Sequence, residues 1–542
     1  MPFGFPGADG RLQGIETRHR IASGESHVDG SAHDPVEMDR STLDWPETPR
    51  GNDSMKYPGV LFCASEVSPY AKTGGLADVA GALPAALQGL GCDVRIFMPL
   101  YRSVREQEHP LTPLARNLSV PVGVHDYTVH LWESRTAAGV PVYFLEKDEF
   151  FDRGFLYGTP TTGDYEDNAE RFVTFCRSAY LLCNRLNWYP SVFHLHDWQT
   201  GLAAAYLDRL RRRDSNFAHS GALFTIHNLA YQGIFPAVHF GLTGLPAEAF
   251  SPQGMEFWGN CNFLKAGLVY SDILTTVSRG YSLEIQTAAL GHGLDGVLRE
   301  RRDRLHGILN GIDTEAWNPE TDPLIPCRYS ATDLSGKRRC KKELIAELGL
   351  PAESRETPLL SMISRLAGQK GFDLIEDIMN DLMELPLSLV ILGTGDALIE
   401  RRLKEFANLY PEKLRMLACF DESLAHRIEA ASDIFLMPSR YEPCGLNQMY
   451  SLRYGTVPVV HATGGLDDSV IDVMEHPESG TGFKFREYRA SNLLETVSAA
   501  LAFHREKEKW TAMQRRGMSQ DFSWTRSAGE YLDLYRLIAA RK

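Results

Sequence analysis

A lysine and two glycines directly before a predicted helix could bind a phosphate group. The segment reads Lys72-Thr73-Gly74-Gly75. A glycine pair lets the backbone approach a ligand closely, because neither residue has a Cβ. Free N–H groups at the start of a helix favour an anion, and Lys72 adds a full positive charge. At these residues alone, an ordinary strand-to-helix turn with a solvated lysine is the alternative.

A second cationic segment, Ser364–Gly371, contains Arg365 and Lys370. It follows the apolar run Leu359–Ile363, which reads as a buried strand, and precedes a helical pattern. Two cations at the carboxyl end of a strand suit a departing diphosphate. A solvated basic turn is the alternative here.

A carboxylate follows another apolar run. Glu442 lies in the segment Tyr441–Leu446, after Ile434–Met437. Such a carboxylate could hold sugar hydroxyls, and a lone surface glutamate is the alternative. Cys444 has no neighbouring base in the sequence, so we interpret it as a packing or backbone-contact residue and not as a nucleophile.

Histidines end two further apolar runs. His194 and His196 close one run, and His227-Asn228 closes the next. Side chains two residues apart on a strand point the same way, but a metal site needs more ligands than the nearby sequence offers. We therefore predict no metal site. His196, His227 and Asn228 are candidates for sugar contacts, with a hydrogen-bonded structural histidine as the alternative.

The elements that must position these residues form two successive α/β patterns. Alternating apolar runs and helical patterns predict doubly wound parallel sheets wrapped by helices. The rhythm restarts after Leu309–Asp313, so we expect two Rossmann-like halves with a ligand cleft between them. The predicted strands are Val60–Ala64, Val94–Met98, Val142–Leu145, Val192–Leu195, Ala222–Ile226 and Ile273–Val277, then Leu359–Ile363, Leu387–Leu392, Arg415–Ala418, Ile434–Met437 and Val457–Val460. The predicted helices are Leu76–Leu90, Asp167–Leu186 and Gly201–Arg212, then Phe372–Leu385, Ala397–Leu409, Ser423–Ala431 and Asn492–Phe503.

Composition excludes several classes of partner. The 542 residues carry a formal net charge of -14, which argues against nucleic acid or an anionic membrane. Nine cysteines without a CxxC pair favour a reduced, cytoplasmic protein, and no apolar run is long enough to span a bilayer. Residues 1–54 lack a hydrophobic period and are predicted to be disordered. This segment has no apolar signal core and is too acidic for a transit peptide.

Six of the segments resemble, in order, the motifs of the bacterial glycogen synthase and plant starch synthase family. The resemblance covers essentially everything after the first 54 residues. The matching stretches are Lys72–Val79, His196–Trp198, His227–Gly233, Asn310–Asp313, Ser364–Gly371 and Glu442–Leu446. Six ordered motifs are far more specific than any one of them.

The resemblance implies a retaining glucosyltransferase of the GT-B type that uses neither a metal nor a bound cofactor. ADP-glucose would be the donor co-substrate and the non-reducing end of a 1,4-α-glucan the acceptor, with no nucleic-acid or membrane partner. The implied domains are residues 55–309 on the acceptor side, residues 310–525 for the donor, and a helix within residues 526–542 that returns to the first domain. By the same likeness, catalytic roles fall to Glu442, His196, Arg365 and Lys370; donor contacts to Lys72, Gly74, Gly75, Asp78, Gly393, Cys444, Gly445, Leu446 and Thr463; and acceptor or sugar contacts to His227 and Asn228.

Two positions depart from related transferases. Tyr450 stands where many retaining transferases carry a second glutamate, a departure that the synthase family shares, and His461 precedes the Thr463-Gly464-Gly465 turn where many relatives carry arginine. The alternatives are a UDP-glucose-dependent transferase, a phosphorylase requiring pyridoxal phosphate, and a non-catalytic glucan-binding protein. A dinucleotide oxidoreductase is disfavoured, because Gly393-Thr394-Gly395-Asp396 lacks the third glycine of that fingerprint.

Overall fold

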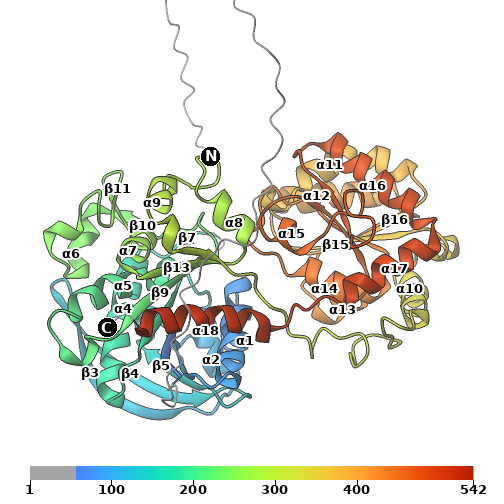
Figure 1. Cartoon of the computed structure of the whole chain (residues 1–542). Coiled ribbons are helices and arrows are strands. Elements are labelled where there is room, and N and C mark those ends of the chain that lie inside the picture. The colour runs from blue at the N-terminus through green and yellow to red at the C-terminus, as the bar shows by residue number, and fades with distance from the viewer. Residues whose placement is uncertain (1–56, 160, 541–542) are drawn as a thin grey trace, which may run out of the picture. The chain divides into compact units, whose positions relative to one another are not determined.

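The computed structural model of the protein describes residues 57–159 and 161–540. The predicted disordered extension, residues 1–54, lies outside them. The described chain contains two sheet-based halves, and we call them the first half (β1 to β14) and the second half (α10 to α17) (Figure 1). The predicted fold class, two doubly wound α/β halves with parallel sheets, is confirmed.

The first half is built on a nine-stranded sheet with the order β14-β13-β9-β8-β1-β2-β5-β4-β3. Its strands from β14 to β5 run parallel to one another. Residues of β8 and β9 are buried throughout, because helices cover both faces, and this explains their continuous apolar runs. The bounds are β1 Gly59–Cys63, β2 Asp93–Pro99, β5 Pro141–Glu146, β8 Val192–His196, β9 Gly221–Ile226, β13 Ile273–Thr276 and β14 Leu305–Gly307.

The sheet ends in an antiparallel pair that the sequence did not predict. Strand β3 (Thr112–Val122) pairs with β4 (His125–Arg135), and β4 pairs with β5. Most side chains of β3 are exposed or half-buried. An edge strand of this kind lacks the apolar run by which buried strands are recognised.

Helices and smaller strands complete the first half. The helices are α1 Gly75–Gly89, α2 Arg102–Glu106, α3 Asp148–Phe151, α4 Asn168–Leu186, α5 Trp198–Leu210, α6 Phe240–Thr243, α7 Phe263–Tyr270, α8 Arg279–Glu284 and α9 Asp295–Glu300. A three-stranded antiparallel sheet contains β10 Ile234–Pro236, β12 Asn260–Asn262 and β11 Glu256–Phe257, and β6 Gly158–Thr159 pairs with β7 Gly163–Asp164.

The second half is built on a six-stranded parallel sheet with the order β17-β16-β15-β18-β19-β20. Its strands are β15 Leu359–Ile363, β16 Ser388–Leu392, β17 Leu414–Leu417, β18 Ile434–Met437, β19 Val457–His461 and β20 Phe483–Phe485. Its helices are α10 Ser335–Glu347, α11 Phe372–Glu384, α12 Ala397–Leu409, α13 Glu422–Ala431, α14 Asn447–Arg453, α15 Gly464–Ser469, α16 Ala490–His504 and α17 Lys507–Met518. The carboxyl ends of β15 and β18 lead into the segments that contain Arg365 and Glu442.

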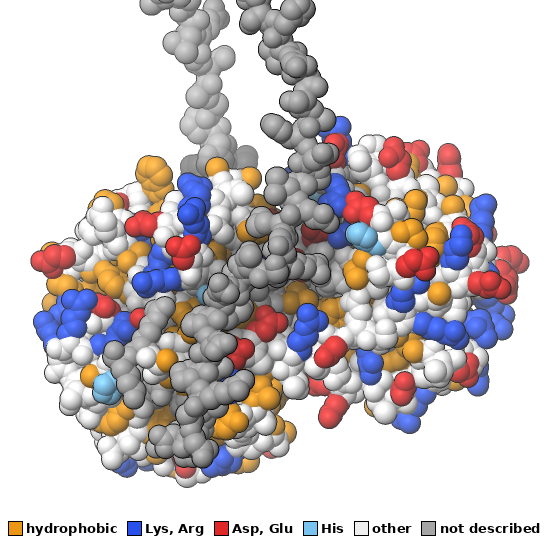
Figure 2. Space-filling model, in the orientation of Figure 1, with side chains coloured by type: hydrophobic (Ala, Val, Ile, Leu, Met, Phe, Trp, Pro, Cys, Tyr) orange, Lys and Arg blue, Asp and Glu red, His pale blue; other side chains and the backbone are white. Residues whose placement is uncertain are grey.

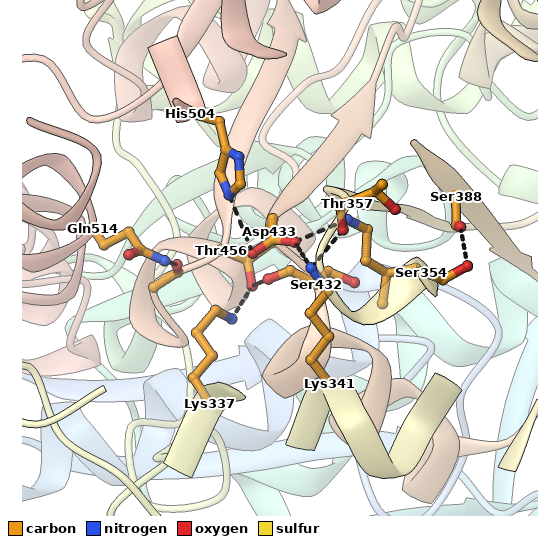
Figure 3. Close-up of polar contacts among 12 residues, drawn as sticks. Lys337, Lys341, Ser354, Thr357, Ser388, Ser432, Asp433, Thr456, His504 and Gln514 are labelled. Carbon is orange, nitrogen blue, oxygen red and sulfur yellow. Dashed lines mark hydrogen bonds and ion pairs between the residues drawn. The ribbon is translucent and has the colours of Figure 1, made fainter. Parts of the chain in front are cut away.

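The amino ends of the second sheet are tied together by a buried ion-pair network (Figure 3). The Nζ atom of Lys341 lies 2.6 Å from Oδ2 of Asp433, which also accepts a 2.8 Å hydrogen bond from the amide of Leu359. His504 lies 3.8 Å from the other carboxylate oxygen, and Lys337 donates to Thr456. Burial raises the pKa of Asp433, but the Lys341 ammonium and His504 outweigh this effect and hold that pKa below its usual value. The carboxylate therefore joins α10 and the starts of β15 and β18.

The last helix, α18 (Trp524–Ala540), packs on the first half. It contacts α1, β8 and β9, and Figure 1 shows it beside α1. The hydroxyl of Tyr535 lies 2.7 Å from Nδ1 of His194, and Ser527 donates a 2.6 Å hydrogen bond to the carbonyl of Leu309. The chain thus passes between the halves twice, and the two passages meet where the amide of Ile312 donates to the carbonyl of Phe522 at 2.8 Å.

The surface drawn in Figure 2 carries lysine, arginine, aspartate and glutamate side chains interspersed on both halves. All nine cysteines fall among the described residues and carry free thiols. Across residues 57–159 and 161–540, no helix combines the length and the apolar character that a membrane crossing requires.

Candidate active site

Loops from both halves line one cavity of about 670 Å³ at the carboxyl ends of the two sheets. This is the edge at which open α/β sheets bind ligands. Predicted site residues that line it are Lys72, Gly74, Gly75, Asp78, His227, Asn228, Arg365, Lys370, Glu442, Cys444, Gly445 and Leu446. The structure therefore brings most of the predicted positions together in one place.

The segment Lys72–Gly75, which we call the lysine–glycine loop, is held in place by a buried glutamate. Glu66, 4% exposed, accepts hydrogen bonds from the amide of Thr73 at 2.5 Å, its hydroxyl at 2.7 Å and the amide of Gly74 at 3.1 Å. The hydroxyl of Tyr157 donates to the same carboxylate at 2.8 Å. The Gly74 amide therefore already has a partner and is not free for the donor, whereas a Cβ added at Gly74 would meet no atom within 4 Å. The loop presents an open backbone surface to the cavity with Lys72 beside it.

On the second half, Lys370 and Glu442 form an ion pair at the cavity wall. Lys370 Nζ lies 2.6 Å from Glu442 Oε2, and the hydroxyl of Ser439 donates to the same oxygen at 2.9 Å. Gly371 makes the turn possible: its φ is +77°, and a Cβ there would lie 1.9 Å from the carbonyl oxygen of Pro438. Only glycine can therefore place Lys370 beside Glu442.

Arg365 lines the same cavity with an exposed side chain. Among the described residues no carboxylate lies within 4 Å of its guanidinium. Arg365 thus offers five N–H donors on the cavity that Lys370 also lines, and such a pair of cations could bind a phosphate group.

The turn after Glu442 closes the floor of the cavity. Burial raises the pKa of Cys444 to about 12, so its sulfur is a thiol and not a nucleophilic thiolate, in accord with the interpretation of this residue as a packing contact. Gly445 has φ +71°, and the hydroxyl of Ser278 from the first half donates to the carbonyl of Pro443 at 2.5 Å. That bond ties the glutamate loop to the opposite half.

The histidines of the first half occupy different positions. His227 lines the cavity, whereas His196 does not. The His196 ring is fully buried at 4.1 Å from the ring of Phe62, and its Nδ1 lies 2.9 Å from Nε2 of His227. Residues two apart on β8 share one face, and on that face the ring of His196 packs against the ring of His194 at 4.0 Å. His196 thus supports His227 from beneath and does not reach the cleft. Burial lowers the pKa of His227 to about 3, so its ring is neutral at pH 7.

Asp197, which the sequence analysis did not select, also lines the cavity. It follows β8 with φ +54°, and its Oδ1 accepts a 2.7 Å hydrogen bond from the amide of His227. Burial raises the pKa of this carboxyl from 3.8 to about 7. Its place directly after a buried strand, next to His196, was the signal that could have identified it. Glu66 was harder to recognise in the sequence, because it holds the loop through two backbone amides and two hydroxyl groups.

Two predicted donor contacts lie outside the lining. Thr463 is 4% exposed, and its hydroxyl donates to Glu284 of the first half at 2.8 Å. Gly393 follows β16 with its amide bonded to the carbonyl of Leu417 at 3.0 Å, and a Cβ there would lie 1.8 Å from the carbonyl oxygen of Ser364. Gly393 therefore allows the backbone of Ser364, the residue before Arg365, to approach closely.

The two departures from related transferases have structural roles. The ring of Tyr450 stacks on Trp317 at 3.9 Å, and His426 stacks on Trp317 at 3.7 Å. These two stacking contacts fix Trp317, which follows the first passage of the chain between the halves, against the second half. His461 places Nδ1 2.8 Å from the carbonyl of Ser439, the residue that holds Glu442. Within the described residues, no three histidine, cysteine, aspartate or glutamate side chains are grouped as metal ligands would be.

Two doubly wound halves with a shared cleft lined by Lys72, Arg365, Lys370 and Glu442 agree with the GT-B glycosyltransferase class, which the family matches establish. Residues 59–300 match the family model for the starch synthase catalytic domain, and residues 350–516 match that for group 1 glycosyl transferases. The chain belongs to the glycogen and starch synthase family. The predicted resemblance and the predicted enzyme class are thus confirmed.

Individual relatives agree with this assignment. A glycogen synthase of Anaeromyxobacter sp. is 51% identical over 482 residues, 89% of this chain and 99% of that protein. A glycogen synthase of Syntrophotalea carbinolica is 48% identical over 88% of this chain and 98% of its own. The solved catalytic domain of starch synthase IV from Arabidopsis thaliana, bound to ADP and acarbose, is 34% identical with a TM-score of 0.82, covering 90% of this chain and all of that one.

Proposed function

We propose that the protein transfers glucose from ADP-glucose to the non-reducing end of a 1,4-α-glucan, with retention of configuration. The observation that carries the proposal is the meeting of Lys72 from one half with Arg365 and Lys370 from the other on a single cavity. The relatives named glycogen synthase and the related structure bound to ADP and acarbose support it.

Arg365 and Lys370 would stabilise the departing diphosphate. Negative charge grows on that group as the glycosidic bond breaks, so fixed cations lower the barrier more than they strengthen substrate binding. Lys370 carries three N–H donors, and it can therefore bind a phosphate oxygen while it keeps its bond to Glu442. We propose that these cations suffice without an added metal or cofactor, and we expect unchanged turnover in a chelator such as EDTA.

Glu442 and the first-half wall would orient the sugar. The Glu442 carboxylate is fixed by Lys370 and Ser439, so its free oxygen can accept bonds from glucose hydroxyls. His227 and Asn228 face it from the other half and would contact the glucose or the acceptor. His196 would act indirectly, by holding the His227 ring.

We propose that the acceptor attacks from the face on which the diphosphate leaves. Asp197 is a carboxyl group on the first-half wall, but its oxygen already accepts the His227 amide and burial disfavours its charged form. Retained configuration in the polymer, followed by NMR, is the expected result. Isolation of a covalent glucosyl-enzyme would contradict same-face attack.

Incubation of the protein with glycogen and labelled ADP-glucose or UDP-glucose tests the proposal. We expect label in the polymer from ADP-glucose. Label from UDP-glucose alone would move the donor assignment to the uridine nucleotide. Binding of glycogen without incorporation from either donor would show a non-catalytic glucan-binding protein.

A further inference from the structure

Trp258 occupies a backbone position that a tryptophan fills at a cost. It forms a two-residue turn with Gly259 between β11 and β12, and the φ angles of the two residues are +50° and +78°. Two positive φ angles characterise the type I′ hairpin turn, in which Asn-Gly is the favoured pair. A bulky side chain in the left-handed region is strained. A tryptophan at position 258 therefore lowers the stability of this turn.

The tryptophan gains little packing in return, an edge contact with the ring of Phe257 at 6.3 Å. Its side chain is 82% exposed, whereas Trp198, Trp510 and Trp524 are all at most 8% exposed. Strained residues without a structural benefit concentrate at binding sites. An exposed tryptophan offers a flat apolar face together with one N–H donor at its edge.

The turn that carries Trp258 is firmly supported. The amide of Gly259 donates to Oε1 of Glu256 at 2.7 Å. Lys265, only 5% exposed, donates to the carbonyls of Glu256 at 2.5 Å and Pro252 at 2.8 Å. The indole is thus presented to solvent from a preorganised base, and its ordering cost on binding a ligand is small.

Aromatic groups connect this turn with the cavity. Tyr231, 55% exposed, lines the cavity mouth, and the ring of Tyr441, next to Glu442, lies 6.4 Å from that of His292. The adjacent Gly293 is so close that an added Cβ would lie 3.0 Å from Phe257 and 3.7 Å from the indole nitrogen of Trp258. Figure 1 shows β11 near α9, which follows this glycine segment. We call Tyr231, Tyr441, His292 and Trp258 the aromatic track.

We propose that Trp258 is a stacking platform for the acceptor α-glucan, at the outer end of the aromatic track. The inference rests on the proposed function and adds a subsite outside the cavity. A glucan chain suits the track because each pyranose ring has an apolar C–H face that stacks on an aromatic ring and hydroxyls that remain in water. A long acceptor whose end lies in the cavity can follow the track to Trp258, whereas a short one ends before it.

The test compares the variants W258N and W258F across acceptors of increasing length. Asparagine suits the turn better than tryptophan, so W258N is expected to fold with an equal or higher Tm. Its KM for glycogen and its Kd for maltoheptaose should rise roughly three- to tenfold, the loss of one aromatic contact, while the values for maltose change less than twofold. W258F should retain most of the affinity. Y57A is the matched control, because Tyr57 is a 46% exposed aromatic residue just before β1, at the amino ends of the parallel strands, and does not line the cavity; it should match the wild type throughout.

If both proteins transferred glucose and their affinities depended on acceptor length in the same way, the subsite at Trp258 would be overturned and the proposed function would stand. A change of W258N in oligomeric mass without a change in glucan affinity would show instead that the indole contacts a second copy of the chain, which also overturns it. Loss of transfer in the wild type would contradict the proposed function, and Kd measurements with maltoheptaose would still decide whether Trp258 binds glucan.

Discussion

Two lysine–carboxylate pairs sit at opposite edges of the second sheet. Lys370 and Glu442 lie 2.6 Å apart at the carboxyl ends of its strands, and Lys341 and Asp433 lie 2.6 Å apart at the amino ends. The first pair borders a cavity and stands beside Arg365, which has no carboxylate within 4 Å among the described residues. The second is enclosed by backbone, since Lys341 also donates to the carbonyl of Thr357 at 2.7 Å. The same chemical pair therefore borders the cavity at one edge of the sheet and holds the fold together at the other, and we propose that only the first acts on a ligand.

The largest effect is expected from R365A at the cavity edge. Loss of a cation from the departing diphosphate should lower kcat roughly 100- to 1000-fold. The free energy of unfolding should change by less than about 0.5 kcal/mol, because the Arg365 guanidinium has no hydrogen bond or ion pair to the residues that the structure describes. Steady-state kinetics and urea unfolding check the two parts. A variant with kcat within about tenfold of the wild type would remove Arg365 from the leaving-group site.

K341M at the opposite edge should give the reverse pattern. It leaves a buried Asp433 carboxylate without its cation, and we expect the free energy of unfolding to fall by about 2–4 kcal/mol, while kcat per folded molecule stays near the wild-type value. Adding D433N should recover part of the loss. If K341M impaired turnover without lowering stability, the division of roles between the two edges would be wrong.

A third substitution, at Glu66, tests whether the position of the lysine–glycine loop controls donor binding. Each oxygen of Glu66 accepts two of its four hydrogen bonds. E66Q replaces one of these oxygens with an NH2 group, which cannot accept from the two donors that face it, so the lysine–glycine loop should lose its fixed position. We expect kcat/KM for the donor to fall about 10- to 100-fold. Y157F, which removes one donor and leaves the three loop bonds, should fall less. Equal effects of both variants would contradict the positioning of the loop by Glu66.

The smallest effect concerns acid stability. The pKa of Asp433 is lower in the folded protein than its usual value near 4, so the unfolded chain binds more protons than the folded one below about pH 4. The stabilisation by this carboxylate is therefore present above pH 4 and is lost as the pH falls through the folded pKa. Urea unfolding from pH 6 to pH 3 should show a shallower decline in D433N than in the wild type. If the free energy of unfolding fell equally in both proteins, the lowered pKa of Asp433 in the folded state would be contradicted.

The strands that are buried on both faces followed from the sequence, and the partly exposed strands at the edge of the first sheet did not. Leu359–Ile363 and Ile434–Met437 were predicted with the observed bounds, because strands covered on both faces read as apolar runs. The pair β3 and β4 was not predicted, since partly exposed edge strands lack that run.

The same division holds at the site. Arg365 and Glu442 were recognisable because they follow buried strands, and Lys72 because it stands with two glycines directly before a helix; the structure gathers all three on one cavity. Glu66 and the buried position of His196 depend on which way side chains turn at a strand end, which the motif alone does not specify.

A double-mutant cycle of Lys72 and Arg365 tests the central claim most directly, since that claim is that the two halves bind one nucleotide sugar in a shared cleft. The quantity to measure is kcat/KM for ADP-glucose with glycogen in the wild type, K72A, R365A and K72A/R365A. We predict that the effects are not additive and differ from their sum by more than about 1 kcal/mol, because both cations act on one transition state. Additivity within about 0.3 kcal/mol would show that the two walls act independently and would contradict the shared site.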